Sequence, residues 1–123
     1  MTASAPLLLI VDDSRTSRTL IRAMLGQLRP DWRTMEAASG EEALAMLDQS
    51  PPDFITLDIN MTGMSGLETA GRIRLKFPDI RIVICSANIQ ESVRQAAEKA
   101  GVHFVPKPIT MKTVTEAVAH FEA

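Results

Sequence analysis

Short apolar runs alternate with longer amphipathic segments along the whole chain. The runs are predicted strands, and they lie at residues 7–11, 32–37, 53–57, 80–84 and 102–105. All but the second are almost continuously apolar, which is typical of parallel strands that helices cover on both faces. Strict alternation of these strands with helices predicts an α/β domain with a doubly wound, five-stranded parallel sheet.

The starts of the predicted helices carry capping signals. Ser39 with Glu42 three residues later has the spacing of a capping box, and Asn88 with Glu91 repeats it. Thr110 is placed to cap the last helix. We therefore expect the second, fourth and fifth helices to begin directly after Ser39, Asn88 and Thr110.

The ends and the buried faces of the helices are predicted in the same way. Pro30 and Pro78 stop the first and third helices, the third being expected over residues 66–77, and Gly101 stops the fourth. Apolar residues at helical spacing define the faces that we expect to be buried. These faces are Leu20, Ile21, Met24, Leu25 and Leu28 in the first helix, Ile89, Val93, Ala96, Ala97 and Ala100 in the fourth, and Val114, Ala117, Val118 and Phe121 in the last.

Four of the five predicted strands deliver acidic, hydroxyl or amine side chains to their carboxyl ends. These are Asp12 and Asp13 after the first strand, Asp58 after the third, Ser86 after the fourth and Lys107 after the fifth. In open α/β sheets, ligands bind beyond this edge. We therefore expect strands 1, 3, 4 and 5 to be neighbours and strand 2 to lie outside, in the flavodoxin-like order 2-1-3-4-5.

Three carboxylates at one edge repel one another unless a cation neutralises them. Oxygen ligands with no His or Cys nearby favour a hard cation such as Mg²⁺, which usually works beside a phosphate. A lysine and a hydroxyl across the pocket suit phosphoryl oxygens. Each residue alone is ordinary as a cap or a surface group, so the prediction depends on the set. Because a carboxylate is a competent nucleophile, the set predicts an aspartyl phosphate on Asp58.

The ordered series of short motifs resembles the receiver domain of two-component response regulators over essentially the whole chain. The motifs are Leu9-Ile10-Val11-Asp12-Asp13-Ser14, Leu57-Asp58-Ile59-Asn60-Met61, Gly63-Met64-Ser65-Gly66, Ser86-Ala87, and Lys107-Pro108 following Gly101. This resemblance implies that Asp58 is the phosphoacceptor. It also implies that Asp12 and Asp13 hold Mg²⁺ together with Asp58, and that the backbone carbonyl of Asn60 is a further ligand.

The resemblance implies, in addition, how a phosphoryl group is bound and sensed. Lys107 would bind it, preceding a cis peptide bond to Pro108. The hydroxyl of Ser86 would swing toward it, and the ring of Phe104 would turn inward to fill the vacated space. The changed surface would be formed by the fourth helix, fifth strand and fifth helix. Candidate contacts there are Gln90, Arg94 and Lys112.

Two departures from the family pattern flank the predicted site. Thr62 stands where the family usually has proline. The absence of proline would loosen the loop after Asp58. Pro106 is also less usual and stiffens the approach of Lys107. We expect neither departure to affect the chemistry. Asn60 and Asn88 occupy positions where the family tunes access of water to the phosphoryl group.

Other reactive residues are interpreted as structural. His103 and His120 lie away from the edge with the acids and are expected to be surface histidines. Cys85 ends a buried strand, so a small core side chain is expected rather than a reactive thiol. Trp32 is expected to cover an edge of the sheet.

Composition narrows the class of protein. The chain has 123 residues and is expected to form one domain over 1–123, with no attached output domain. A net charge of -2 without a Lys/Arg cluster excludes nucleic-acid and membrane-surface binding. The apolar run at 7–11 is too short for a signal peptide or a membrane span. A single cysteine fits a reducing compartment. Because neither targeting feature is present, a cytoplasmic location is expected by default.

The predicted function is that of a response regulator. We expect a sensor histidine kinase to supply the phosphoryl group to Asp58, the protein to catalyse its own phosphorylation and dephosphorylation, and the phosphorylated surface to dock on a partner protein, as in chemotaxis. The alternatives are a phosphorelay intermediate that passes the group to a histidine phosphotransfer protein, and a receiver-like module that only binds. A haloacid dehalogenase-type phosphatase needs an Asp-x-Asp after the first strand, and a nucleotide-binding domain needs a Gly-rich first loop. Both features are missing.

Overall fold

The computed structural model describes residues 5–87 and 90–123, and this part of the chain forms a parallel sheet of five strands with helices on both faces. The strands are β1 (Leu7–Val11), β2 (Arg33–Ala37), β3 (Phe54–Asp58), β4 (Arg81–Ser86) and β5 (His103–Pro106). Their order is β2-β1-β3-β4-β5, and each neighbouring pair is parallel. The predicted fold class and strand order are therefore confirmed.

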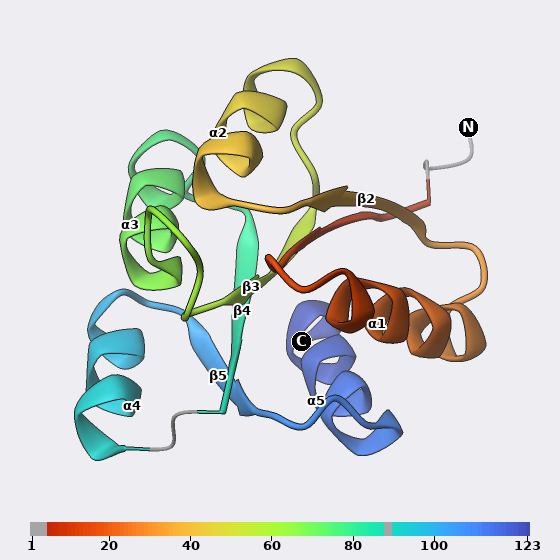
Figure 1. Ribbon diagram of the computed structural model, residues 1–123. Helices are drawn as coiled ribbons and strands as arrows, with labels where there is room; N and C mark the ends of the chain where they lie inside the picture. The colour runs from red at the N-terminus through yellow and green to blue at the C-terminus, as the bar shows by residue number, and fades with distance from the viewer. Residues whose placement is uncertain (1–4, 88–89) are drawn as a thin grey trace.

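The helices divide into two layers (Figure 1). They are α1 (Arg15–Leu28), α2 (Gly40–Gln49), α3 (Gly66–Lys76), α4 (Glu91–Lys99) and α5 (Met111–Glu122). Helices α1 and α5 lie together on one face of the sheet, and α2, α3 and α4 cover the other. Within the described part of the chain, no helix is long and apolar enough to cross a membrane.

Three predicted helix starts can be compared with the structure. The Ser39 hydroxyl accepts a hydrogen bond from the backbone N–H of Glu42 at 3.0 Å, and Thr110 forms a full capping box with Thr113. The predicted start of the fourth helix is wrong by two residues. The N-cap is Gln90, whose carbonyl accepts from the N–H of Arg94. The first helical turn closes on that carbonyl and so sets the start at Glu91. Asn88 itself, like Ile89, lies outside the described residues.

The apolar strands and helix faces form one core on each side of the sheet. The predicted face of α5 is buried completely. In α1, however, Leu20 is 41% exposed, whereas Ile21 and Leu25 are buried. Adjacent helix residues point about 100° apart, so the contact that buries Ile21 leaves Leu20 at its margin. Leu20 was therefore wrongly assigned to the buried face.

Aromatic side chains close the α1/α5 core near the amino ends of the strands. The rings of Trp32 and Phe54 have centroids 5.0 Å apart, and those of Phe54 and Phe121 are stacked at 4.8 Å. Such pairs add to the stabilisation that burial alone provides. Trp32, next to the edge strand β2, thus packs against this core at the edge of the sheet.

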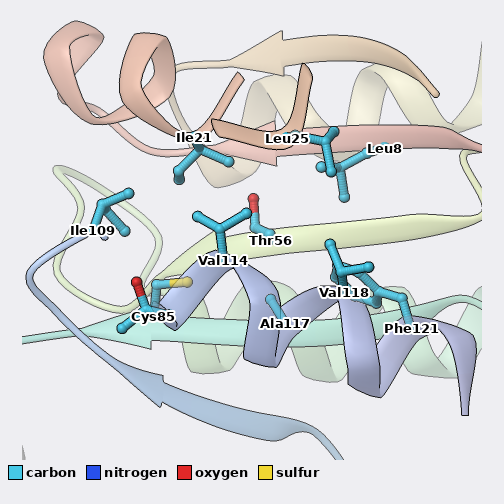
Figure 2. Close-up of a pocket in the computed structure, with 11 residues that line it drawn as sticks. Leu8, Ile21, Leu25, Thr56, Cys85, Ile109, Val114, Ala117, Val118 and Phe121 are labelled. Carbon is cyan, nitrogen blue, oxygen red and sulfur yellow. The ribbon is translucent and has the colours of Figure 1, made fainter. Parts of the chain in front are cut away.

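A small cavity lies in this core between the sheet and helices α1 and α5 (Figure 2). Its volume is about 10 Å³, which is near the lower limit for a single water. The buried hydroxyl of Thr56 borders it and has no hydrogen-bond partner in the described part of the chain. Figure 2 shows this hydroxyl among the apolar side chains of Ile21, Leu25 and Val114. A buried hydroxyl without a partner costs stability.

Candidate functional site

The parallel register brings the carboxyl ends of four strands to one edge of the sheet. Asp12 directly follows β1, Asp58 ends β3, Ser86 ends β4, and Lys107 directly follows β5. Asp58 is paired with Cys85, one residue before Ser86, and the backbone N–H of Lys107 donates to the carbonyl of Ser86 at 2.8 Å. The residues that sequence analysis selected at these strand ends therefore lie at one edge of the sheet.

Three carboxylates gather at this edge. Asp12, Asp13 and Asp58 each offer an oxygen, and these oxygens all lie within 4.8 Å of one another. Asp12 and Asp58 are buried, with 2% and 7% of their surface exposed, whereas Asp13 is exposed. Carboxylate oxygens are the ligands that hard divalent cations prefer, and a cation would relieve the repulsion among these acids. The residues thus fit the Mg²⁺ that the resemblance implies.

The buried position of Asp58 changes its acidity. Burial raises the pKa of the Asp58 carboxyl above its ordinary value, and the charge of Asp12 raises it further. Lys107 and a hydrogen bond from the backbone N–H of Asn60 lower the pKa without cancelling the rise. The charged form of Asp58 is therefore less favourable here than it is for a carboxyl group in water.

Lys107 is the cation that the protein itself places among the acids. Its Nζ donates to Asp12 Oδ2 at 3.1 Å and lies 3.6 Å from Asp58 Oδ1. Burial lowers the pKa of Lys107, but the charges of Asp58 and Asp12 outweigh it and leave the pKa raised. Lys107 thus stays an ammonium group. The peptide bond from Lys107 to Pro108 is cis, as the resemblance implied.

Arg18 is a residue of the site that sequence analysis missed. Its Nη1 donates to the backbone carbonyl of Asp12 at 2.7 Å, while its Nε donates to Glu36 Oε1 at 2.9 Å. The N–H of Ser14 donates to Asp12 Oδ1 at 2.8 Å. Together these bonds hold the β1–α1 loop and aim the Asp12 carboxylate. An arginine in the second turn of a helix that directly follows an acid pair was the available signal.

Thr62, in the loop from β3 to α3, contacts one of the acids through its backbone. The backbone N–H of Thr62 donates to Asp13 Oδ2 at 3.3 Å, and that of Met64 donates to Glu41 Oε1 at 3.3 Å. Gly63 between them has a φ of +83°, which glycine adopts readily. The residue at 62 therefore does contact the site, because threonine has the backbone N–H that proline lacks.

The two residues predicted to form the switch differ in exposure. Ser86 is fully buried, with 0% of its surface exposed. Phe104 is half-buried on β5, and the guanidinium of Arg94 lies over its ring. Gln90, Arg94 and Lys112 are all exposed. Asn60 is exposed two residues beyond Asp58, and Asn88, for which a role in dephosphorylation was predicted, lies outside the described residues.

The remaining candidates lie apart from the acids. His103 is the first residue of β5 and so lies at the amino end of that strand, whereas the acids lie at the carboxyl ends. Its ring stacks on that of His120 with centroids 4.5 Å apart. Both histidines are half-buried. Cys85 is buried, and burial raises the pKa of its thiol to about 12. A thiol with this pKa is almost wholly protonated at neutral pH, which agrees with its interpretation as a core residue.

Comparison with known proteins gives consistent matches. The family model described as the response regulator receiver domain matches residues 8–119. Chemotaxis protein CheY of Listeria monocytogenes is 38% identical over 113 residues, which cover 90% of this chain and 93% of the relative. The positive alginate biosynthesis regulatory protein of Pseudomonas aeruginosa is 34% identical, over 89% of this chain and 44% of that protein. The solved structure of Vibrio cholerae chemotaxis protein CheY4 superimposes with a TM-score of 0.86, at 24% identity, over 95% of this chain and 98% of that chain.

Proposed function

Since the chain belongs to the response regulator receiver domain family, we propose that residues 1–123 form one receiver domain that accepts a phosphoryl group on Asp58 in two-component signal transduction. One observation carries this proposal. The buried Asp58 carboxylate lies at the carboxyl edge of the sheet with Lys107 3.6 Å away and two further acids beside it. A nucleophile, a cation and a set of metal ligands are thus placed together.

The donor is the phosphohistidine of a sensor histidine kinase. An oxygen of the Asp58 carboxylate attacks the phosphorus atom, the phosphorus–nitrogen bond breaks, and the imidazole nitrogen leaves with the electron pair. Asp12, Asp13 and Asp58 would hold Mg²⁺ with the backbone carbonyl of Asn60, and the cation would supply positive charge to the phosphoryl oxygens. Lys107 already lies beside Asp58 and is free to exchange its bond with Asp12 for one with a phosphoryl oxygen.

Phosphorylation is read on the face formed by α4, β5 and α5. The hydroxyl of Ser86 bonds a phosphoryl oxygen, and the half-buried ring of Phe104 turns inward behind it. The exposed residues Gln90, Arg94 and Lys112 then contact a partner protein. A chemotaxis-type partner is supported by the name of the Listeria relative, which the chain matches over nearly its whole length.

Mass spectrometry of the trapped acyl phosphate tests the assignment. With Mg²⁺ and acetyl phosphate or a partner kinase, the wild type is expected to carry one phosphoryl group on Asp58, and Asp58→Ala none. Asp48→Ala is a matched control, because Asp48 is an exposed acid on α2 whose ion pair is with Lys76. Its labelling is expected to equal that of the wild type.

Two results would redirect the proposal. A labelled Asp58→Ala protein would disprove Asp58 as the acceptor, and a wild type that never takes the group would favour a module that only binds. Rapid onward transfer to a histidine phosphotransfer protein would favour a relay intermediate over a docking regulator.

A further inference from the structure

Asp13 differs from the other two acids of the site in what neutralises it. Lys107 contacts Asp12 at 3.1 Å and Asp58 at 3.6 Å. Asp13 is exposed, and the backbone N–H of Thr62 donates to its Oδ2 at 3.3 Å. This amide therefore supplies the positive end of a dipole to the one acid of the three that Lys107 does not contact.

The donor belongs to a loop that is also held outside the site. Met64, two residues further on, donates to Glu41 at the start of α2. The Glu41 carboxylate also lies against Gly63, because a side chain added at that glycine would approach Glu41 Oε2 to 2.8 Å. The β3–α3 loop is thus attached at Thr62 to the acids and at Met64 to α2.

We infer that the backbone N–H of Thr62 competes with the divalent cation for Asp13, so that the residue at position 62 is a positioning residue that sets the metal affinity of the site. The inference rests on the proposed metal site. In the metal-free pocket the hydrogen bond stabilises the Asp13 charge. A cation held by the three acids would supply that neutralisation in place of the amide. A bond that stabilises the metal-free state alone lowers metal affinity, because affinity is the difference between the two states.

Substitution by proline removes this donor, because proline is the residue without a backbone N–H, and it also fixes φ at position 62 and restricts Met61. We expect Thr62→Pro to bind Mg²⁺ about two- to tenfold more tightly by calorimetry, the range that corresponds to one net hydrogen bond. Thr62→Ala keeps the N–H and is expected to match the wild type. Glu41→Ala removes the acceptor of the Met64 N–H, and its affinity for Mg²⁺ is not expected to rise. Melting temperatures in a chelator show whether each variant is folded.

A second measurement needs no substitution. In an NMR titration of the wild type with Mg²⁺, the Thr62 amide proton is expected to exchange faster with solvent and to shift toward the position of a free amide. The Met64 amide is expected to keep its protection, since its acceptor Glu41 is outside the metal site. Unchanged exchange at Thr62, or equal affinities for Thr62→Pro and Thr62→Ala, would overturn the inference while leaving the metal site intact. A wild type that binds no Mg²⁺ would instead disprove the proposed site and the inference with it.

Discussion

The guanidinium of Arg94 lies over the ring of Phe104, with its Cζ 5.1 Å from the ring centroid. Arg94 is an exposed residue of α4, whereas Phe104 is half-buried on β5. A ring that turns inward must leave this cation–π contact. The contact therefore favours the ring position seen here and opposes the proposed switch.

Removal of the guanidinium is expected to ease the movement of Phe104. An exposed cation–π contact contributes about 0.5–1 kcal/mol, so Arg94→Ala should raise the inward population of the ring about two- to fivefold. Ring-proton NMR shifts, scaled between the free and beryllofluoride-bound states, measure that population. Lys112→Ala removes a cation from α5 on the same face and serves as the control. An identical Phe104 rotamer with and without beryllofluoride, with unaltered partner affinity, would defeat the switch mechanism.

Magnesium is expected to stabilise the folded protein through the acids. A ligand at 100 times its dissociation constant adds about 2.7 kcal/mol to the free energy of unfolding if it binds the folded state alone. The melting temperature of the wild type should therefore rise when Mg²⁺ is added. Asp13→Ala removes one of the three clustered carboxylates, so its shift should be much smaller. A shift equal to that of the wild type would contradict the site.

The raised pKa of Asp58 predicts that the stability of the folded protein without metal depends on pH. Burial first, and the charge of Asp12 next, raise the pKa of this carboxyl in the folded state. Its protonation therefore contributes stability that is complete below the ordinary carboxyl pKa and is lost as the pH rises through the folded pKa. At pH 7 in a chelator, Asp58→Asn should melt above the wild type.

The difference in melting temperature between Asp58→Asn and the wild type should shrink as the pH falls toward about 4, the ordinary range of a carboxyl pKa. Asp48→Asn changes an exposed acid on α2 and should show no such gain. A lower melting temperature for Asp58→Asn at pH 7 would mean that the bond to Lys107 outweighs the cost of burying the charge.

The buried hydroxyl of Thr56 predicts a stabilising substitution. Thr56→Val keeps the shape of the side chain and removes a hydroxyl without a partner in the described part of the chain. We expect the free energy of unfolding to rise by about 1 kcal/mol. Thr69→Val is the matched control, because the equally buried hydroxyl of Thr69 donates to Ser65 at 2.8 Å and its loss should destabilise. Urea denaturation measures both, and destabilisation by Thr56→Val would contradict the expectation.

Local interactions are the part of this protein that the sequence by itself determined. Strand and helix patterns depend on side-chain periodicity, and the caps at Ser39 and Thr110 depend on hydrogen bonds three residues apart. The strand order could also be predicted, because chemistry at the strand ends indicated which strands had to be neighbours. Asp12, Asp58 and Lys107 were found for the same reason.

Contacts between distant segments were decided by the tertiary structure alone. The exposure of Leu20 depends on how closely α1 packs, and no local pattern encodes that distance. The bond from Thr62 to Asp13 joins residues 49 positions apart. Its donor is a backbone group, which nearly every residue type carries, so the residue at position 62 reveals nothing about its partner. Only the path of the β3–α3 loop brings this N–H to the acid, and that path depends on the packing of the whole sheet edge.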